Sequence, residues 1–439
     1  MNVKVVKFGG SSLADATQFK KVADIIKADE KRRYVIPSAP GKRFSDDTKV
    51  TDMLYKCYEI SSKGGDITEQ FGLIKERYNG IIKDLGLELS LDKQFAEIEH
   101  CLAGKSGRDY AASRGEYLNG IILAAYIGYE FIDAAEVILF DENGAFMLRD
   151  TITALRERLA TVEHAVIPGF YGITLNGTVK TFSRGGSDVT GSIVARAVRA
   201  EIYENWTDVS GFLVADPRIV ENPNVIKTIT YKELRELSYM GATVLHEDAI
   251  FPVRTAGIPI NIKNTNDPSA DGTMIVSEDT SEEISKTTIT GIAGKKGFCA
   301  INIEKAMMNS EIGFVRRVLE ILEKFNLSFE HIPSGIDTMS IVLSSVALED
   351  KEDALIAQIR KEIQPDHIEV EHNIALLAVV GRGMCKTRGT AARVFASLAH
   401  ARINVKMIDQ GSSELNLIIG VGESDFELAT RCIYDIFVN

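Results

Sequence analysis

The sequence predicts an α/β layered domain with a mostly parallel sheet, followed by two related modules of the α+β class. Three observations predict this order. Runs of β-branched residues alternate with longer stretches of helical period from residue 2 to about 265. A polar, turn-rich stretch follows at 264–286, and beyond it the chain repeats itself. We therefore expect domains at 1–285, 286–370 and 371–439.

The alternation in the first domain favours strands that are joined by helices and lie mostly parallel. Helical period marks residues 19–28 and 108–126. The strand-like runs are VKVVKF (3–8), RYVIPS (33–38), AEVILF (135–140), HAVIPGF (164–170) and IPINIKN (258–264).

The repeat aligns residues 313–343 with 389–419 without a gap. The identical positions include Gly313, Arg317 and Leu322, which match Gly389, Arg393 and Leu398. Each copy reads as strand, glycine loop, helix, strand, turn and strand, which is typical of a helix layer on an antiparallel sheet. The stretch TTITGIA (287–293) is expected to add a strand to one of the two modules.

Composition excludes several classes of protein. The formal charge of −12 disfavours nucleic acid as a partner. Five cysteines without a close pair indicate neither a disulfide framework nor a thiolate zinc site, which fits a reducing cytoplasm. The N-terminus lacks the apolar segment of a signal peptide, and no apolar run is long enough to span a membrane.

Residues 4–12, KVVKFGGSS, form a strand that ends in two glycines ahead of a helical pattern. Bare backbone N–H groups and a helix N-terminus favour a phosphate or a carboxylate, and Lys7 adds a point charge. The alternative is a tight turn in which Ser12 or Asp15 caps the helix and Lys7 is solvated.

A second strand, TVKTF, runs into SRGGSDVTGS (183–192), with helical pattern from Ile193. Arg184 and Asp188 flank the glycines there. Loops that leave the carboxyl ends of parallel strands converge on one edge, so both glycine loops are expected to face one ligand. A site that transfers a phosphoryl group needs such a clamp on charge and little else.

Competing motifs fail. The Gly-Lys-Ser at 104–106 has Glu99 where a Walker loop needs glycine, and VVGRGMCK (379–386) lacks the third glycine of a dinucleotide loop. The seven histidines show no metal-hydrolase or triad spacing.

Several motifs in the right order resemble those of aspartokinases of the amino acid kinase family. They are KFGGSS (7–12), SAPG (38–41), VTDML (50–54), SRGE (113–116), SRGGSD (183–188), TDVSGFLVADPR (207–218) and the doubled C-terminal module, which resembles a pair of ferredoxin-like ACT domains. The resemblance covers nearly the whole chain. It implies transfer of phosphate from ATP, with Mg²⁺, to the side-chain carboxylate of L-aspartate.

The resemblance also implies roles for individual residues. Lys7, Gly10 and Asp188 would be catalytic, with Asp188 orienting the lysine or standing near the metal, whose ligands stay unassigned. The expected substrate residues are Ser38, Thr51, Glu116, Phe170, Arg184 and Ser187, with Arg184 on a carboxylate and Glu116 on the ammonium. The expected nucleotide residues are Lys7, Gly9, Gly10, Ser11, Thr207, Asp208, Phe212 and Arg218.

One position departs from the family pattern, because GATVLH (241–246) has Thr243 where many aspartokinases have a lysine near the nucleotide. By resemblance, the doubled module binds an amino acid effector and joins subunits into a dimer or tetramer. The expected effector residues are Met308, Ser310, Gly313, Phe314, Val315, Ser334, Asp337, Thr338 and Ser340. Glu311 and Asp337 favour lysine as the effector over threonine.

Two other functions stay open at this point. A kinase for acetylglutamate or glutamate would share the nucleotide motif but should lack SRGGSD and the doubled module. A non-catalytic amino acid sensor would keep the modules and lose Lys7, Arg184 and Asp188, which are present. Since residue 439 follows directly on the second module, the enzyme is expected to be monofunctional, without a homoserine dehydrogenase portion.

Overall fold

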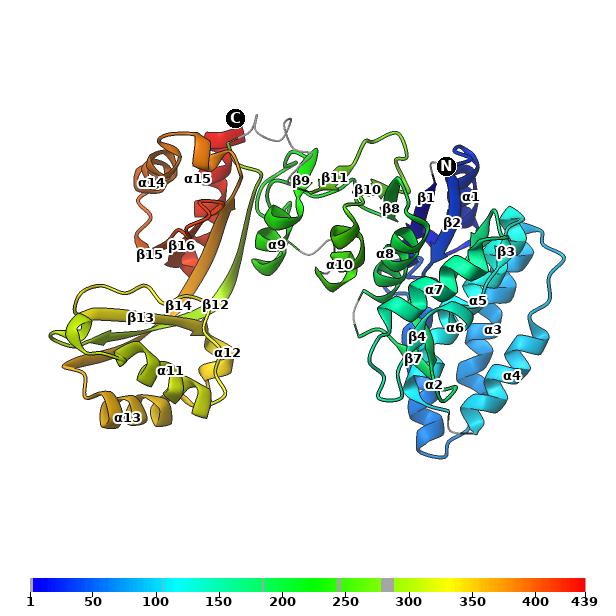
Figure 1. Cartoon of the computed structure of the whole chain (residues 1–439), viewed down its shortest axis with the longest axis horizontal. Coiled ribbons are helices and arrows are strands. Elements are labelled where there is room, and N and C mark those ends of the chain that lie inside the picture. The colour runs from blue at the N-terminus through cyan, green and yellow to red at the C-terminus, as the bar shows by residue number, and fades with distance from the viewer. Residues whose placement is uncertain are drawn as a thin grey trace. The chain divides into compact units, whose positions relative to one another are not determined.

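The structure is a computed structural model that describes residues 3–104, 106–183, 185–242, 245, 247–277 and 288–438. The chain divides into two compact units (Figure 1). The first comprises Met1–Phe212, Val225–Tyr231 and Thr243–Ser281, and the second Leu213–Asn224, Lys232–Ala242 and Glu282–Asn439. The predicted domain limits at 285 and 370 stay predictions; these units differ from them because two inner segments belong to the second unit.

The first unit is built on a mostly parallel sheet, as the alternation of strands and helices predicts. Its strand order is β3-β5-β2-β1-β8-β10-β11-β9, and β11 runs antiparallel to β10. The strands are β1 (Lys4–Phe8), β2 (Arg32–Pro37), β3 (Glu130–Phe131), β5 (Ala165–Val166), β8 (Ile202–Thr207), β9 (Thr228–Thr230), β10 (Ile260–Asn264) and β11 (Thr273–Val276).

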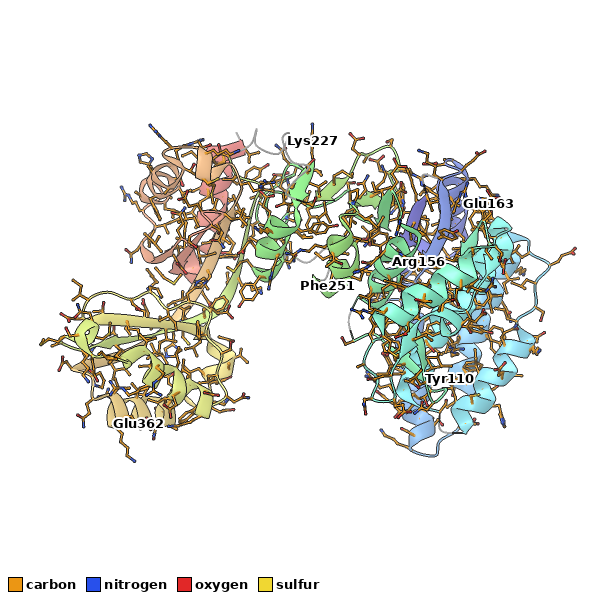
Figure 2. All side chains as sticks on the ribbon, in the orientation of Figure 1. Tyr110, Arg156, Glu163, Lys227, Phe251 and Glu362 are labelled. Atoms are coloured by element: carbon orange, nitrogen blue, oxygen red, sulfur yellow. The ribbon has the colours of Figure 1, made fainter. Side chains whose placement is uncertain are left out.

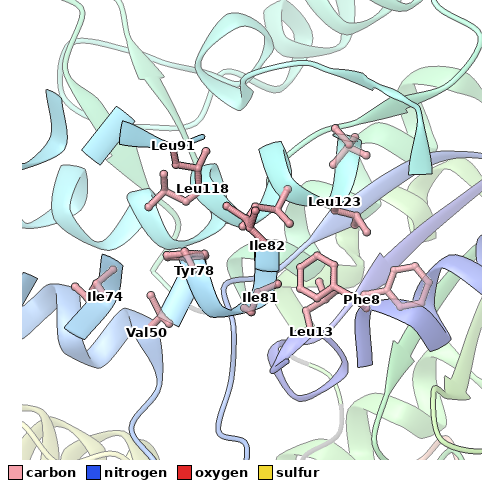
Figure 3. Close-up of a cluster of buried hydrophobic side chains, with 14 of the residues drawn as sticks. Phe8, Leu13, Val50, Ile74, Tyr78, Ile81, Ile82, Leu91, Leu118 and Leu123 are labelled. Atoms are coloured by element: carbon pink, nitrogen blue, oxygen red, sulfur yellow. The ribbon is translucent and has the colours of Figure 1, made fainter. Parts of the chain in front are cut away.

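Helices cover both faces of this sheet. Val6, Phe8 and Trp206 point into a core formed with α1 (Ala16–Lys27), α2 (Val50–Ser62), α3 (Thr68–Leu85), α4 (Asp92–Ala103) and α5 (Arg108–Ile127). Figure 3 shows part of this core, where Tyr78 and Ile82 of α3 lie among leucine and isoleucine side chains. Because side chains alternate along a strand, Lys7 lies on the opposite face, which packs on α8 (Gly186–Val198). Helices α7 (Leu148–Leu159) and α10 (Glu247–Ala256) pack against α8.

A small sheet lies beside this layer, with strand order β4-β6-β7. Its strands are β4 (Leu139–Phe140), β6 (Tyr171–Thr174) and β7 (Val179–Thr181). The predicted strand at 135–140 is therefore wrong in its first half, since Ala134–Val137 form the short helix α6. Asp133 and Glu136 close a capping box there, and this local hydrogen bonding outweighs the β-branched residues that follow.

The second unit has an antiparallel sheet with strand order β13-β12-β14-β16-β15. Its strands are β12 (Gly291–Glu304), β13 (Thr338–Ser344), β14 (His367–Val380), β15 (Val405–Asp409) and β16 (Asn416–Gly422). Two cores share this sheet. One contains α11 (Phe314–Lys324), α12 (Ser345–Leu348) and α13 (Glu352–Ile363), and the other contains α14 (Thr390–His400) and α15 (Phe426–Val438). This agrees with the predicted α+β class of both modules.

The two modules exchange strand ends. Residues 291–295 of β12 pair with 376–380 of β14 in the second module, whereas 298–304 pair with β13 and with 367–374 in the first. The stretch 287–293 therefore contributes to the second module in its described part. One continuous ladder joins both cores.

Residues of α9 (Tyr231–Tyr239) from Lys232 onward, together with Leu213–Asn224, pack on these modules. The Glu233 carboxylate accepts hydrogen bonds from the Thr290 hydroxyl at 2.7 Å and the Arg382 N–H at 3.0 Å. Ala215 and Val220 lie in the core of the second module. Among the described residues, no helix is long and apolar enough to cross a membrane.

Candidate active site

The first glycine loop follows β1 directly. Gly10–Leu13 form the 3-10 helix η1, and the Asp15 side chain caps α1 by accepting from Gln18 N–H at 3.0 Å. Gly9 N–H donates to Trp206 O at 3.0 Å inside the sheet. This corrects the predicted role of Gly9 as a phosphate donor, because its N–H is already used. Gly10 and Ser11 begin the 3-10 helix, where N–H groups lack partners within the helix.

Lys7 meets the second loop through a buried polar cluster. Its Nζ lies 2.6 Å from Asp188 Oδ1 and 3.3 Å from Asn205 Oδ1, and Asn205 Nδ2 donates to Asp188 Oδ1 at 2.8 Å. Lys7 is only 8% exposed, so the charge is held in place and is not simply solvated. Sequence reasoning missed Asn205, whose one signal is a polar residue inside the strand IYENWT.

The second loop becomes helical earlier than the pattern predicts. The helix α8 starts at Gly186, not Ile193, because Gly185 at φ 55° makes the turn. Ser187 and Asp188 therefore lie in the first turn, whose N–H groups favour anions. Arg184, the expected carboxylate clamp, lies outside the described residues.

The loop Ser38–Gly41, which follows β2, packs directly on the first glycine loop. Gly41 N–H donates to Gly10 O at 2.8 Å, and Ser38 N–H donates to Phe8 O at 3.0 Å. A Cβ at Gly41 would lie 2.6 Å from the Gly10 carbonyl carbon, so only glycine fits there. The expected phosphate and substrate segments are thus in backbone contact.

Arg77 of α3 forms hydrogen bonds to backbone oxygens at the ends of both loops. Its guanidinium donates to Ala14 O at 2.9 Å and Gly41 O at 2.8 Å, and it pairs with Asp47 Oδ2 at 2.8 Å. Asp47 is also bound by Arg43, and these arginines hold the pKa of its carboxyl well below the usual range. No sequence motif marks Arg77, since an arginine in an amphipathic helix is normally solvated.

Glu116 of α5 faces the same loop and is 6% exposed. Burial raises the pKa of Glu116 to about 8, and a backbone hydrogen bond from Ala39 opposes this rise. Its Oε2 has no hydrogen-bond partner among the described residues. One turn further along, Asn119 Nδ2 donates to Ser38 O at 2.6 Å. A buried carboxyl with one oxygen left without a partner suits a ligand's ammonium group.

The other expected substrate residues approach this loop from three elements. Phe170 has φ 80°, and its Cδ2 would lie 2.3 Å from a Cβ at Gly186. A Cβ at Gly169 would likewise lie only 2.6 Å from the side chain of Ser187. Thr51 stands in the first turn of α2, next to Val50, whose N–H donates to Pro40 O at 3.2 Å. The glycines allow these segments to pack in backbone contact.

The expected nucleotide residues are divided between the two units. Thr207 ends β8 and its hydroxyl donates to Asp208 Oδ1 at 3.2 Å. Phe212 is buried and its N–H donates to Thr273 Oγ1 at 2.8 Å, so its ring belongs to the protein core. Arg218 belongs to the second unit, where it pairs with Asp216 at 2.6 Å. Thr243 lies outside the described residues.

The expected effector residues occupy two touching loops of the first module. Asn309 N–H, in η4 (Met308–Ser310), donates to Ile336 O at 3.1 Å, and Met307 N–H donates to Asp337 Oδ1 at 2.8 Å. Met308 and Phe314 are buried in the module core, whereas Ser310, Val315, Ser334 and Thr338 are exposed. Gly313 caps α11 with φ 78°, and Ser340 Oγ donates to Asn302 Oδ1 at 2.7 Å.

Glu311 is less available to a cationic effector than its sequence position suggests. Lys305 Nζ lies 2.9 Å from its carboxylate, and Arg317 pairs with the other oxygen. Both cations lower the pKa of Glu311. Of the two carboxylates that were expected to favour lysine as the effector, Asp337 is therefore the one that remains in the proposal.

Comparison with known proteins gives matches over both parts of the chain. Residues 2–264 match the amino acid kinase family and residues 377–437 match an ACT domain. Aspartokinase 3 of Bacillus subtilis is 41% identical, with 99% of this chain and 98% of that protein covered.

Solved structures agree in fold over the whole chain. An aspartate kinase from Clostridium acetobutylicum, described as an allosteric enzyme, is 54% identical with a TM-score of 0.92, and both chains are fully covered. E. coli aspartokinase III, solved with aspartate and ADP and also with lysine and aspartate, is 23% identical with a TM-score of 0.74 over both full chains. The latter likeness concerns the fold alone.

Proposed function

We propose how this chain works from the premise that it belongs to the amino acid kinase family and, within it, to the aspartokinases. It is a kinase that phosphorylates aspartate and carries an allosteric ACT region. In the reaction, an oxygen of the side-chain carboxylate of L-aspartate attacks the γ-phosphorus of ATP. The bond to the bridging oxygen breaks, ADP takes its electron pair, and 4-phospho-L-aspartate forms.

The observation that carries the proposed site is the cluster of Lys7, Asp188 and Asn205 at the end of β1. Lys7 holds the transferring phosphates, and Asp188 and Asn205 fix the position of its ammonium. Gly10 and Ser11 donate backbone N–H groups to the same phosphates. The acceptor carboxylate is ionised at neutral pH, so positioning and charge supply the catalysis and no general base is needed.

The substrate binds beside this cluster. Glu116 receives its ammonium, and Ser38, Thr51, Phe170 and Ser187 line the pocket. Arg184 takes a carboxylate. Thr207, Asp208, Phe212 and Arg218 serve the nucleotide; Phe212 does so by supporting the segment from the core, because its ring is buried.

Mg²⁺ accompanies ATP. The chemistry of the donors fits this cation, because Asp188 keeps one carboxylate oxygen beyond the one that binds Lys7, and Mg²⁺ is commonly held by one or two carboxylates together with substrate phosphates. When bound, it neutralises charge on the β- and γ-phosphates. Asp188 is the residue of this chain that would contact it.

The ACT modules bind an amino acid end product that inhibits the enzyme. We prefer lysine over threonine, and the candidate contacts are Ser334, Asp337, Thr338 and the loop 307–315. Association of subunits into a dimer or tetramer through these modules is part of the proposal, and so is a cytoplasmic location, which the five unpaired cysteines support.

The function is tested with hydroxylamine, which traps acyl phosphates. The chain is incubated with ATP and Mg²⁺ and with L-aspartate, L-glutamate or N-acetylglutamate in turn. Product with aspartate alone is expected. Product with either of the other acids and none with aspartate would show that the substrate assignment is wrong. No product with any of the acids, from a protein that binds ATP, would reject the proposed reaction.

A further inference from the structure

A cavity of about 420 Å³ lies in the first unit away from the candidate active site. It is lined by Arg156, Arg196, Arg199, Glu201 and the turn 256–259. Glu201 directly precedes β8 and residue 259 directly precedes β10, so the cavity lies at the amino ends of these strands. The glycine loops leave the opposite, carboxyl ends. A strand of this length places about 20 Å between the two sites.

The charge around this cavity is unusual for a chain with a formal charge of −12. Three arginines face one glutamate, and Glu201 lies 3.5 Å from Lys31. Within the described part of the chain, none of the three arginines forms an ion pair with a carboxylate. Three positive charges around one concave surface create a local potential that attracts anions.

Two of the guanidinium groups are anchored while most of their N–H groups stay available. Arg156, labelled in Figure 2, lies on α7 and donates from Nε to Ala197 O of α8 at 3.0 Å. Arg196 donates from Nη1 to Thr255 Oγ1 of α10 at 2.6 Å. The forks are thereby held before a ligand arrives, which lowers the entropic cost of binding.

Arg199 is held in a backbone conformation that an arginine rarely adopts. It ends α8 at φ 52° and ψ 53°, in the left-handed region. In the same unit, α3 and α5 end in this conformation with Gly86 and Gly128. A non-glycine residue there is strained, and such strain often accompanies a functional side chain.

We propose that this cavity binds a phosphate group, either free or carried by a small metabolite, at a site separate from the candidate active site. Arg156, Arg196 and Arg199 supply forked donors that match phosphate oxygens. The carbonyl end of α8 repels anions, and the three guanidinium groups must outweigh that repulsion; a phosphate offers them more acceptor oxygens than a single carboxylate does. The volume leaves room for a few atoms beyond the phosphate.

Isothermal titration of the full-length chain with inorganic phosphate tests this site. The Lys7→Ala background separates it from the candidate active site. Saturable binding is expected, and Arg199→Gly should weaken it at least tenfold, by the loss of one charged fork. Arg149→Gln, which removes an exposed arginine of α7 outside the cavity, is the matched control and should leave the affinity unchanged.

The same variant distinguishes binding from folding. Arg199→Gly relieves the left-handed backbone and should not lower Tm, although it should reduce the Tm increase that phosphate gives. A second variant, Arg156→Gln, should weaken binding similarly. No saturable binding up to about 10 mM phosphate, or equal affinities in wild type, Arg199→Gly and Arg156→Gln, would overturn the proposal.

Glycerol 3-phosphate identifies the source of the phosphate. An affinity at least tenfold tighter than that of inorganic phosphate, lost in Arg199→Gly, indicates a phosphorylated metabolite. Equal affinities, again lost in that variant, indicate free phosphate.

Discussion

At the scale of single residues, the protonation state of Glu116 determines how the candidate substrate pocket receives an ammonium ion. Burial raises the pKa of this carboxyl to about 8, so in the free enzyme at neutral pH it is mostly neutral. Pairing with an ammonium requires the ionised form. Aspartate binding therefore releases a proton below pH 8.

This linkage predicts the pH dependence of kcat/KM for aspartate. The value should rise about tenfold per pH unit from pH 6 to 7, as the ionised fraction of Glu116 grows, and level off above about pH 8. Steady-state rates at saturating ATP measure it. A flat profile over this range would contradict the role of Glu116.

The stability of the folded protein should respond in the opposite sense. Between about pH 4.5 and 8 the folded state keeps a proton on Glu116 that the unfolded chain has lost, so the contribution of this residue to stability falls as pH rises. Glu116→Gln should raise the free energy of unfolding by about 3 kcal/mol at pH 7 while it raises KM for aspartate. Chemical denaturation at pH 5 and pH 7 shows whether the gain grows with pH.

Asn205 is a positioning residue in our account, because it contacts Lys7 and Asp188 but no substrate. Asn205→Ala should lower kcat about 10- to 100-fold, as expected for the loss of hydrogen bonds to charged groups, with a smaller change in KM for aspartate. Asn143→Ala, an exposed asparagine of a turn, is the control. Equal kcat in both variants would show that Lys7 needs no such support.

At the scale of elements, the account depends on the contact between the loops that follow β1 and β2. Gly41→Ala would place a methyl group 2.6 Å from the Gly10 carbonyl carbon and 2.8 Å from Ser11 N. The phosphate loop must then move, so kcat should fall at least tenfold and KM for ATP should rise.

Gly72→Ala in α3 is the matched control for this change. A Cβ at Gly72 meets no atom within 4 Å, so alanine should stabilise the helix by about 0.5–1 kcal/mol and leave the rates unchanged. If Gly41→Ala keeps wild-type rates, the two loops do not act as one unit.

Sequence patterns located elements well where periodicity and glycine signals agreed. The run 3–8, the first glycine loop and the repeated module follow from local residues, and the structure agrees; at the second glycine loop the helix begins at Gly186, earlier than the predicted Ile193. Patterns failed where hydrogen bonds from residues outside the run determine the local structure. The Asp133 cap makes part of a predicted strand the helix α6. The N–H of Gly9, expected at a phosphate, donates to Trp206 O. Arg77 and Asn205 were missed because their partners, Gly41 and Asp188, are distant in sequence.

At the scale of the whole molecule, segments of the kinase chain are built into the regulatory unit. The residues of α9 from Lys232 onward belong to that unit, and the Tyr239 hydroxyl donates to Glu330 of the first module. This bond raises the pKa of Tyr239 to about 12, so the phenol stays a donor at working pH. Glu330 lies four residues from Ser334, an expected effector contact.

Tyr239→Phe should therefore weaken feedback inhibition without changing activity in the absence of effector. The half-inhibiting concentration of lysine is expected to rise about fivefold, which corresponds to a coupling of about 1 kcal/mol. Tyr58→Phe in α2 serves as the control. Unchanged inhibition in Tyr239→Phe would show that this hydrogen bond of α9 has no role in feedback inhibition.

The pairing of the two modules lay beyond sequence reasoning. The repeat reveals two copies, but the residues of β12 on either side of 296 join different modules, and no local signal distinguishes their partners. The same holds for 213–224, which begins within the motif TDVSGFLVADPR (207–218) and packs in a regulatory core. Contacts between residues far apart in the sequence determine both the partners of β12 and the placement of 213–224.

The central claim is that KFGGSS holds the transferring phosphates through Lys7, and the most direct test is the rate of aspartyl phosphate formation by Lys7→Ala. The account predicts a loss of kcat of at least 100-fold, because one charge on the transferring group is removed, while Tm and lysine binding are retained. Lys20→Ala, an exposed lysine of α1, should keep the wild-type rate. An unchanged rate in Lys7→Ala would contradict the account.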